Sequence, residues 1–221
     1  MKSWEQQFAR SAFLRSADIA HDLKTPLNIA VLNLELLRMR VAKLTGENPD
    51  KKVNGYAKSV ELELRRIAQV IDAFFLLSIP PRSEPEPGRH ELRPMIEEAA
   101  ERARIPLTAD AGDLVVECHL GRARELFRLF FEGTSRLSLA SPKGKVLSKA
   151  GKLVLEVEGS SPSSELDASK LFKFYYTDAS GNPELSLASA RLIAETYGGD
   201  VEAEDLGGGL RLTLSLPLGE R

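Results

Sequence analysis

A repeat of apolar residues near the N-terminus is the feature that most restricts the fold. Between Phe13 and Leu44 apolar residues recur at alternating steps of three and four, the spacing of a helix face that packs against another helix. The residues of this seam are Phe13, Ala17, Ala20, Leu23, Leu27, Ala30, Leu34, Leu37, Val41 and Leu44. The seam predicts one long helix over about residues 4–45, which needs a partner helix to cover it.

A second amphipathic helix is expected soon after the first. Thr45, Gly46, Asn48 and Pro49 end the first helix, and the next helical pattern runs from about Asp50 to Ser78. Its apolar side carries Val53, Tyr56, Val60, Leu64, Ile67, Ile71 and Phe74. Two helices joined by a short loop form an antiparallel hairpin. Because one hairpin cannot cover both seams, we expect two copies to form a four-helix bundle; the alternative is a monomeric hairpin buried against the rest of the chain.

A proline-rich stretch divides the chain into two domains. The segment Ile79–Arg89 holds four prolines among alternating charges, a composition that builds neither helix nor sheet. We therefore expect a helical domain over residues 1–80, a linker over 81–89 and a second domain over 90–221.

The second domain alternates between strand and helix patterns. The expected elements are a short strand at His90–Leu92, a helix from Pro94 to about Arg104, a strand in LVVECHL, a helix from Arg122 to about Leu137, a hairpin of Lys145–Ser148 with Lys152–Glu158, a helix from about Leu185 to Tyr197, and a closing strand in LRLTLSLPL. On the helix from Arg122, we expect Phe127, Phe130 and Phe131 to be mostly core, with one of them facing out. The pattern predicts an α/β sandwich of one sheet with helices on one side.

Composition excludes several classes of function. The chain has 221 residues, of which 43% are apolar and 28% are charged, and it has no apolar run long enough to span a membrane. The single cysteine, Cys118, excludes an internal disulfide and a cysteine-cluster metal site. A formal net charge of −2 offers no basic field for nucleic acid. We expect a soluble, cytoplasmic protein without membrane or nucleic-acid partners.

The sequence HDLKTPL, from His21 to Leu27, carries the chemistry of the first helix. His21 lies one position past the seam residue Ala20, so its ring should meet solvent, and Thr25 follows one turn later on the same strip. A neutral imidazole becomes a good nucleophile when a carboxylate such as Asp22 accepts the proton of its other nitrogen. This arrangement suits phosphoryl transfer; the alternative is an ordinary solvated histidine on a helix surface.

This sequence resembles the H-box of two-component sensor histidine kinases, in which a histidine and an acid precede a Thr or Asn and then Pro-Leu. The upstream run AFLRSADIA is similar to the lead-in to that box. The resemblance implies that His21 is phosphorylated, that Asp22 is its acid–base partner, and that Thr25 helps to position water for dephosphorylation. The exposed strip beside them, with Lys24 and Asn28, is the expected docking surface for a partner.

The second domain resembles the ATP-binding domain of the same kinases. The string LASARLIAETYGGDVEAEDLGGGLRLTLSLPL, Leu187 to Leu218, matches the last helix, Gly-Gly turn and terminal hairpin of that domain. The resemblance therefore extends over nearly the whole chain. It implies a dimerisation and phosphotransfer hairpin followed by a kinase-type ATPase domain.

The residues that hold nucleotide in that family are replaced. Two asparagines four apart on one helix correspond to Arg128 and Glu132, and no shift restores them because that helix contains no asparagine. The adenine-binding loop corresponds to Gly159, Ser161 and Ser163 within GSSPS, which has no carboxylate.

The glycine-rich phosphate loop corresponds to ELSL, with Glu184 and Ser186 where glycines are expected. A carboxylate repels phosphate at a place where backbone N–H groups should hold it. The resemblance thus implies a degenerate ATPase domain that binds no nucleotide.

These observations favour a dimeric histidine phosphotransferase that moves phosphoryl groups between His21 and aspartates of response-regulator receiver domains. Such a protein binds no cofactor itself, because the receiver brings its own Mg²⁺. Two alternatives remain open: an ATP-dependent kinase with an atypical nucleotide site, and a non-catalytic pseudokinase that acts as an interaction module.

Overall fold

The chain divides into two compact units, Met1–Ile79 and Pro80–Arg221. The computed structural model describes residues 27–44, 51–78, 86–110, 112–160, 168–173, 176 and 184–219, with the side chains of α2 described for residues 53–71.

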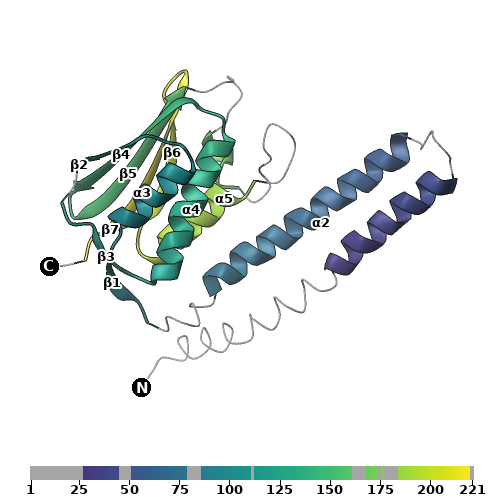
Figure 1. Ribbon diagram of the computed structural model, residues 1–221, viewed down its shortest axis with the longest axis horizontal. Coiled ribbons are helices and arrows are strands. Elements are labelled where there is room, and N and C mark those ends of the chain that lie inside the picture. Colours follow the sequence, from purple (N-terminus) through teal and green to yellow (C-terminus); the bar gives the residue numbers. More distant parts are fainter. Residues whose placement is uncertain are drawn as a thin grey trace. The chain divides into compact units, whose positions relative to one another are not determined.

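The described residues of the first unit form a pair of helices (Figure 1). The first described helix covers residues 27–44, and α2 covers Lys51–Ser78, which confirms the predicted second helix. An ion pair joins the two helices, with Arg38 Nη1 3.5 Å from Glu61 Oε2. The predicted part of the first helix before residue 27 and its breaker cluster at 45–49 lie outside the described residues.

The helical unit buries little of its apolar surface. Leu27, Ala30 and Leu34 of the seam are half-buried, whereas the seam residues Leu37 and Leu44 are 60% and 76% exposed. A single partner helix covers only one side of a heptad seam, so the other side stays in solvent. Other exposed apolar side chains of this unit are Ile29, Leu32, Leu36, Met39, Val53, Tyr56, Val60 and Ile67.

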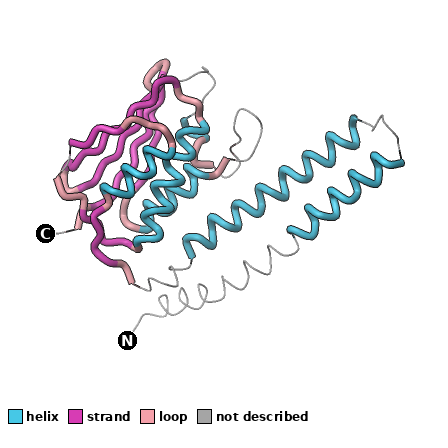
Figure 2. The backbone as a smooth tube through the Cα atoms, viewed as in Figure 1, coloured by secondary structure: helices cyan, strands magenta, loops and turns pink. Residues whose placement is uncertain are grey.

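The second unit contains a five-stranded mixed sheet (Figure 2). Its strands are β2 (Leu107–Asp110), β4 (Ala140–Lys149), β5 (Lys152–Ser160), β6 (Asp200–Asp205) and β7 (Gly209–Pro217), in the order β2-β4-β5-β7-β6. β2 pairs with β4 in parallel, and the other neighbours are antiparallel. A separate two-stranded antiparallel sheet joins β1 (Gly88–Glu91) to β3 (Val115–Cys118).

Three helices cover one face of the larger sheet (Figure 2). They are α3 (Arg93–Arg102), α4 (Leu120–Arg136) and α5 (Ser186–Thr196), and a short 3-10 turn lies at Ala168–Lys170. Alternate residues of the strands face this layer, so that β5 buries Leu153, Leu155 and Val157. The closing strand β7 likewise buries Leu210, Leu212, Leu214 and Leu216. The predicted α/β sandwich is confirmed.

Three details differ from the sequence-based expectations. The strand β2 is not among the expected elements, and the described residues of the second unit form two sheets rather than one. β1 begins at Gly88, within the stretch 81–89 predicted to be linker, because its backbone pairs with β3.

The expectation that one phenylalanine of α4 faces out is wrong. Phe127, Phe130 and Phe131 are all at most 1% exposed. The ring centroids of Phe130 and Phe131 lie 5.5 Å apart in an edge-to-face contact. α4 packs against both α3 and α5, so its buried face is wider than a single stripe.

Candidate functional site

The candidate phosphoacceptor lies just before the first described helix. His21, Asp22, Lys24 and Thr25 are outside the described residues. Asn28, predicted to belong to the docking strip, is exposed on the helix at 27–44.

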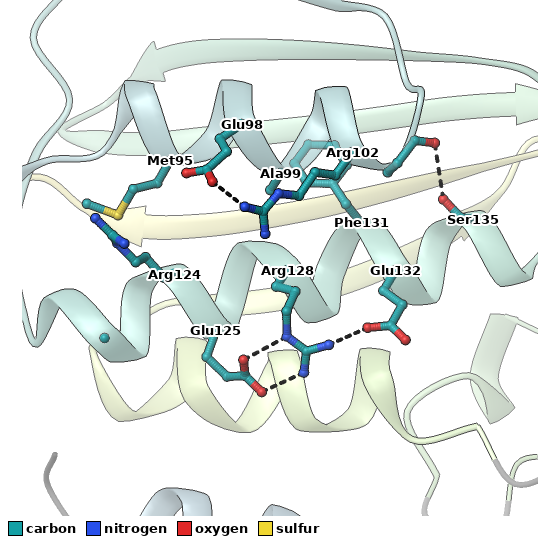
Figure 3. Close-up of a pocket in the computed structure, with 12 residues that line it drawn as sticks. Met95, Glu98, Ala99, Arg102, Arg124, Glu125, Arg128, Phe131, Glu132 and Ser135 are labelled. Carbon is teal, nitrogen blue, oxygen red and sulfur yellow. Dashed lines mark hydrogen bonds and ion pairs between the residues drawn. The ribbon is translucent and has the colours of Figure 1, made fainter.

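Arg128 and Glu132, predicted to replace the nucleotide-binding asparagines, lie in a chain of ion pairs along α4 (Figure 3). Arg128 donates to Glu125 through Nε at 2.8 Å and Nη2 at 2.7 Å, and its Nη1 is 2.5 Å from Glu132 Oε2. The spacing of three and four residues brings these charges together on one helix face. The hydrogen bond to Glu125 raises the pKa of Arg128, and the charges of Glu125 and Glu132 act in the same direction against partial burial.

These charges line a groove between α3 and α4 with a volume of about 550 Å³ (Figure 3). Its α3 wall carries Glu98 and Arg102, which pair at 2.6 Å. The groove surface between the charged walls includes Met95, Ala99, Ala103 and Phe131. Arg128 and Glu132 therefore border an open groove beside α3.

The residue of α4 that packs against α5 is Gly133, one position after Glu132. Gly133 is buried, and a Cβ atom there would lie 2.8 Å from Leu187 Cγ and 3.1 Å from Leu187 N. Leu129, one turn earlier, is 8% exposed. A shift of one residue thus replaces Arg128 and Glu132 by Leu129 and Gly133, which offer no side-chain ligand for magnesium.

Glu184 lies at the start of α5 with only 3% of its surface exposed. Its Oε1 accepts a hydrogen bond from the backbone N–H of Ser186 at 2.7 Å, and its Oε2 pairs with Arg136 at the end of α4. Arg136 also pairs with Glu132. The ion-pair chain therefore runs from Glu125 through Arg128, Glu132 and Arg136 to Glu184, and it connects the exposed groove to a buried carboxylate.

Gly159, the first position of the predicted adenine loop, lies at the end of β5 opposite Leu210 of β7. A Cβ atom at Gly159 would lie 2.8 Å from Leu139 Cβ, so close packing requires glycine here. Ser161 and Ser163 are outside the described residues. Among the residues that the structure describes, no group of three or more His, Cys, Asp or Glu side chains is placed to hold a metal ion.

Sequence reasoning missed a second contact between α4 and α5. His119, immediately before α4, has its Nδ1 2.8 Å from the hydroxyl of Tyr197, which follows α5. The backbone N–H of His119 also donates to this hydroxyl at 3.4 Å. No sequence signal predicts a pair 78 residues apart. Side-chain contacts therefore join the antiparallel helices α4 and α5 at both ends. His119 contacts Tyr197 at one end, and Arg136 pairs with Glu184 at the other.

The sequence comparison finds a match for the helical unit. Residues 14–80, which include His21, match the family model described as the His Kinase A (phospho-acceptor) domain. These residues are therefore similar to a phospho-acceptor domain. No curated protein matches the sequence.

Solved structures show the same fold over most of the chain. The Acinetobacter baumannii histidine kinase AdeS matches with a TM-score of 0.53 and 16% identity, covering 90% of this chain and 98% of its own. Full-length ShkA, solved in complex with AMPPNP, matches with a TM-score of 0.51 and 15% identity over 94% of this chain. This match spans 46% of ShkA.

The helical region of His Kinase A type is therefore followed by an α/β sandwich like the ATPase domain of histidine kinases. The family model thus covers residues 14–80, and the solved histidine kinases share the fold of the chain. Within the described parts of the chain, no helix is both long enough and apolar enough to cross a membrane.

Proposed function

We propose that the protein is a dimeric histidine phosphotransferase of a two-component phosphorelay. His21 receives a phosphoryl group from the aspartyl phosphate of one receiver domain and passes it to the aspartate of another. The chain itself binds no ATP, and the Mg²⁺ for the transfer belongs to the receiver domain. We expect this exchange to take place in the cytoplasm.

One observation supports the loss of nucleotide binding more than any other. The charged side chains of α4, where the resemblance places magnesium and nucleotide ligands, bind one another in a chain from Glu125 to Arg136. A hydrogen bond to a charged group contributes about 1.5–3 kcal/mol. Loss of three subsites therefore removes about as much free energy as a micromolar affinity represents, about 8 kcal/mol.

The chemistry at His21 follows from the residues beside it. A ring nitrogen of the neutral imidazole attacks the phosphorus of the receiver's aspartyl phosphate, forming an N–P bond while the P–O bond to the aspartate breaks and the carboxylate leaves. Asp22 holds the proton of the other ring nitrogen and stabilises the charge that develops. Transfer to a second receiver reverses these steps, and Thr25 positions water where the phosphoryl group is lost by hydrolysis. Lys24 and Asn28 contribute to the docking surface.

Dimerisation is proposed from the uncovered surface of the helical unit. Side chains such as Leu32, Leu36 and Met39 are 52–62% exposed in the single chain. A second hairpin buries this surface in a four-helix bundle. Burial of each large apolar side chain contributes about 1.5–3 kcal/mol.

The direct test is transfer from a labelled, phosphorylated receiver domain to the purified chain, with His21→Ala beside the wild type. We expect label on the wild type and none on His21→Ala. His90→Ala is the matched control, because His90 lies on β1 in the other unit, and it should accept label normally. Transfer to His21→Ala at the rate of the wild type would rule out the proposed role of His21.

An ATP-dependent kinase is the second candidate, because ShkA, which shares this fold, was solved with AMPPNP bound. Incubation with labelled Mg-ATP alone discriminates the two. Label on His21 under these conditions identifies a kinase, whereas label that requires a phosphorylated receiver identifies a phosphotransferase. If His21→Ala supports signalling as well as the wild type does, the protein acts instead as a non-catalytic interaction module.

A further inference from the structure

We infer that Glu184 is an autoinhibitory side chain, which excludes phosphate groups from the start of α5 by occupying the place of an anion itself. The inference rests on the proposed function, because it explains how the ATPase-like unit is kept free of nucleotide. It goes further in assigning the exclusion to one buried carboxylate, and not only to the loss of ligands elsewhere.

The geometry of Glu184 is that of a bound anion. The carboxylate is almost fully buried, at 3% exposure, and each oxygen has a donor. Oε1 accepts from the N–H of Ser186, the first residue of α5, at 2.7 Å, and Oε2 pairs with the guanidinium of Arg136. A backbone N–H at a helix start together with a guanidinium forms a favourable environment for phosphate. Here both groups already hold a carboxylate of the same chain.

The rest of the ion-pair chain keeps Arg136 in place. Arg136 also pairs with Glu132, which pairs with Arg128. Its guanidinium therefore lies between two carboxylates, and an incoming phosphate would have to displace Glu184 while meeting the negative charge of Glu132. Removal of Glu184 leaves a cation and a backbone donor beside each other with one carboxylate fewer, which favours recruitment of an anion.

A purely structural role for Glu184 predicts a different result. In that case the ion pair only fastens α5 to α4, and removal of the carboxylate lowers stability without creating affinity for anions. Anion binding by folded variants therefore distinguishes the two roles.

The test measures binding of inorganic tripolyphosphate, and separately of Mg-ATP, to the full chain by the amide NMR signals of Ser186 and Leu187. The variants are Glu184→Gly, which removes the carboxylate, and Glu184→Gln, which keeps its shape without the charge. We expect at least one folded variant to bind tripolyphosphate at least tenfold more tightly than the wild type. Adding Arg136→Gln to that variant should abolish the gain.

Glu125→Gln is the matched control, because Glu125 belongs to the same ion-pair chain through Arg128, at the end opposite to Glu184. It should bind tripolyphosphate no better than the wild type. Folded Glu184 variants without increased affinity would overturn the inference, as would failure of both variants to fold, since that result assigns Glu184 a structural role alone.

Failure of this inference is distinguishable from failure of the proposed function. Label on wild-type His21 from Mg-ATP alone would contradict the phosphotransferase, whatever the Glu184 variants do. Unchanged tripolyphosphate affinity in folded Glu184 variants would contradict the autoinhibitory role. It would not contradict the proposed function, which is tested by transfer from a phosphorylated receiver.

Discussion

The two units differ in how far they bury their apolar side chains. In the helical unit Leu37 and Met39 are 60% and 62% exposed, whereas in the α/β unit Phe127 and Phe130 are fully buried. Leu206, at 42%, is the exposed large apolar side chain among the described residues of the α/β unit. The α/β unit thus completes its own core, whereas the described helices of the helical unit leave large apolar side chains exposed. The proposed dimer therefore belongs to the helical unit alone.

A charge on the exposed face of the helical unit should have the largest effect. Leu36 is 52% exposed, and Leu36→Glu places a carboxylate in the proposed dimer interface of both copies. At about 1.5–3 kcal/mol for each buried leucine, we expect dimerisation to weaken by about 3–6 kcal/mol. Light scattering over a range of protein concentrations measures this loss.

The matched control for Leu36→Glu is the same substitution at Leu206 in the turn between β6 and β7. It should leave the mass of the assembly unchanged. A dimer that survives Leu36→Glu but dissociates with Leu206→Glu would mean that the interface lies on the α/β unit and not on the helical unit.

Truncation of a core phenylalanine should affect the α/β unit almost as strongly. Phe130 is fully buried and contacts Phe131 edge to face, so Phe130→Ala removes a ring that its neighbours cannot replace. We expect the free energy of unfolding to fall by about 3–5 kcal/mol, measured by denaturant unfolding.

Leu32→Ala offers the comparison in the helical unit, because Leu32 is 60% exposed in the single chain. Its effect should depend on protein concentration, since the proposed dimer buries this side chain, whereas the effect of Phe130→Ala should not. If the effect of Leu32→Ala on stability is the same at all protein concentrations, then no dimer buries this side chain, and the difference between the two units is contradicted.

Replacing a glycine by alanine should change the stability in opposite directions in the two units. At Gly133 the new Cβ would lie 2.8 Å from Leu187 Cγ, so Gly133→Ala should force α4 and α5 apart and destabilise the unit by about 1–3 kcal/mol. At Gly55 of α2 the new Cβ would have no atom within 4 Å other than its chain neighbours and the backbone of its own helix, so Gly55→Ala should stabilise the helix by about 0.5–1 kcal/mol. Thermal unfolding of both variants checks the signs, and a stabilising Gly133→Ala would mean that the contact between α4 and α5 is loose.

The sequence predicted the regular elements well, because their signals are local. Helical periodicity located α2, α3, α4 and α5 to within a few residues, and alternation located β5 and β7. The unexpected strand β2 has only four residues, and Leu107 is its one half-buried side chain. It forms by parallel pairing with β4, 37 residues away at Leu107 and Gly144, and no local pattern records such a pairing.

The sequence predicts the ion pairs within α4 but not the ion pair that joins α4 to the start of α5. The ion pairs of Arg128 with Glu125 and Glu132 follow from spacings of three and four on one helix. The pair of Arg136 with Glu184 does not, because 48 residues separate them. The local sequence identified Glu184 as an unusual residue at the start of a helix, but its partner depends on how α4 and α5 pack.

Exposed ion pairs should show the smallest effects and give the finest comparison. The pair of Glu98 with Arg102 on α3 is 54% and 72% exposed, so Arg102→Ala should lower stability by at most about 0.5 kcal/mol. On α2, Arg65 pairs with Glu61 at 2.6 Å, and Glu61 also reaches Arg38 of the other helix. In an isolated hairpin Arg65→Ala should behave like Arg102→Ala, because Arg65 is 60% exposed. A loss for Arg65→Ala well above that of Arg102→Ala, growing as the protein is concentrated, would mean that a second copy covers the Glu61 network; equal small losses would place that network outside the dimer interface.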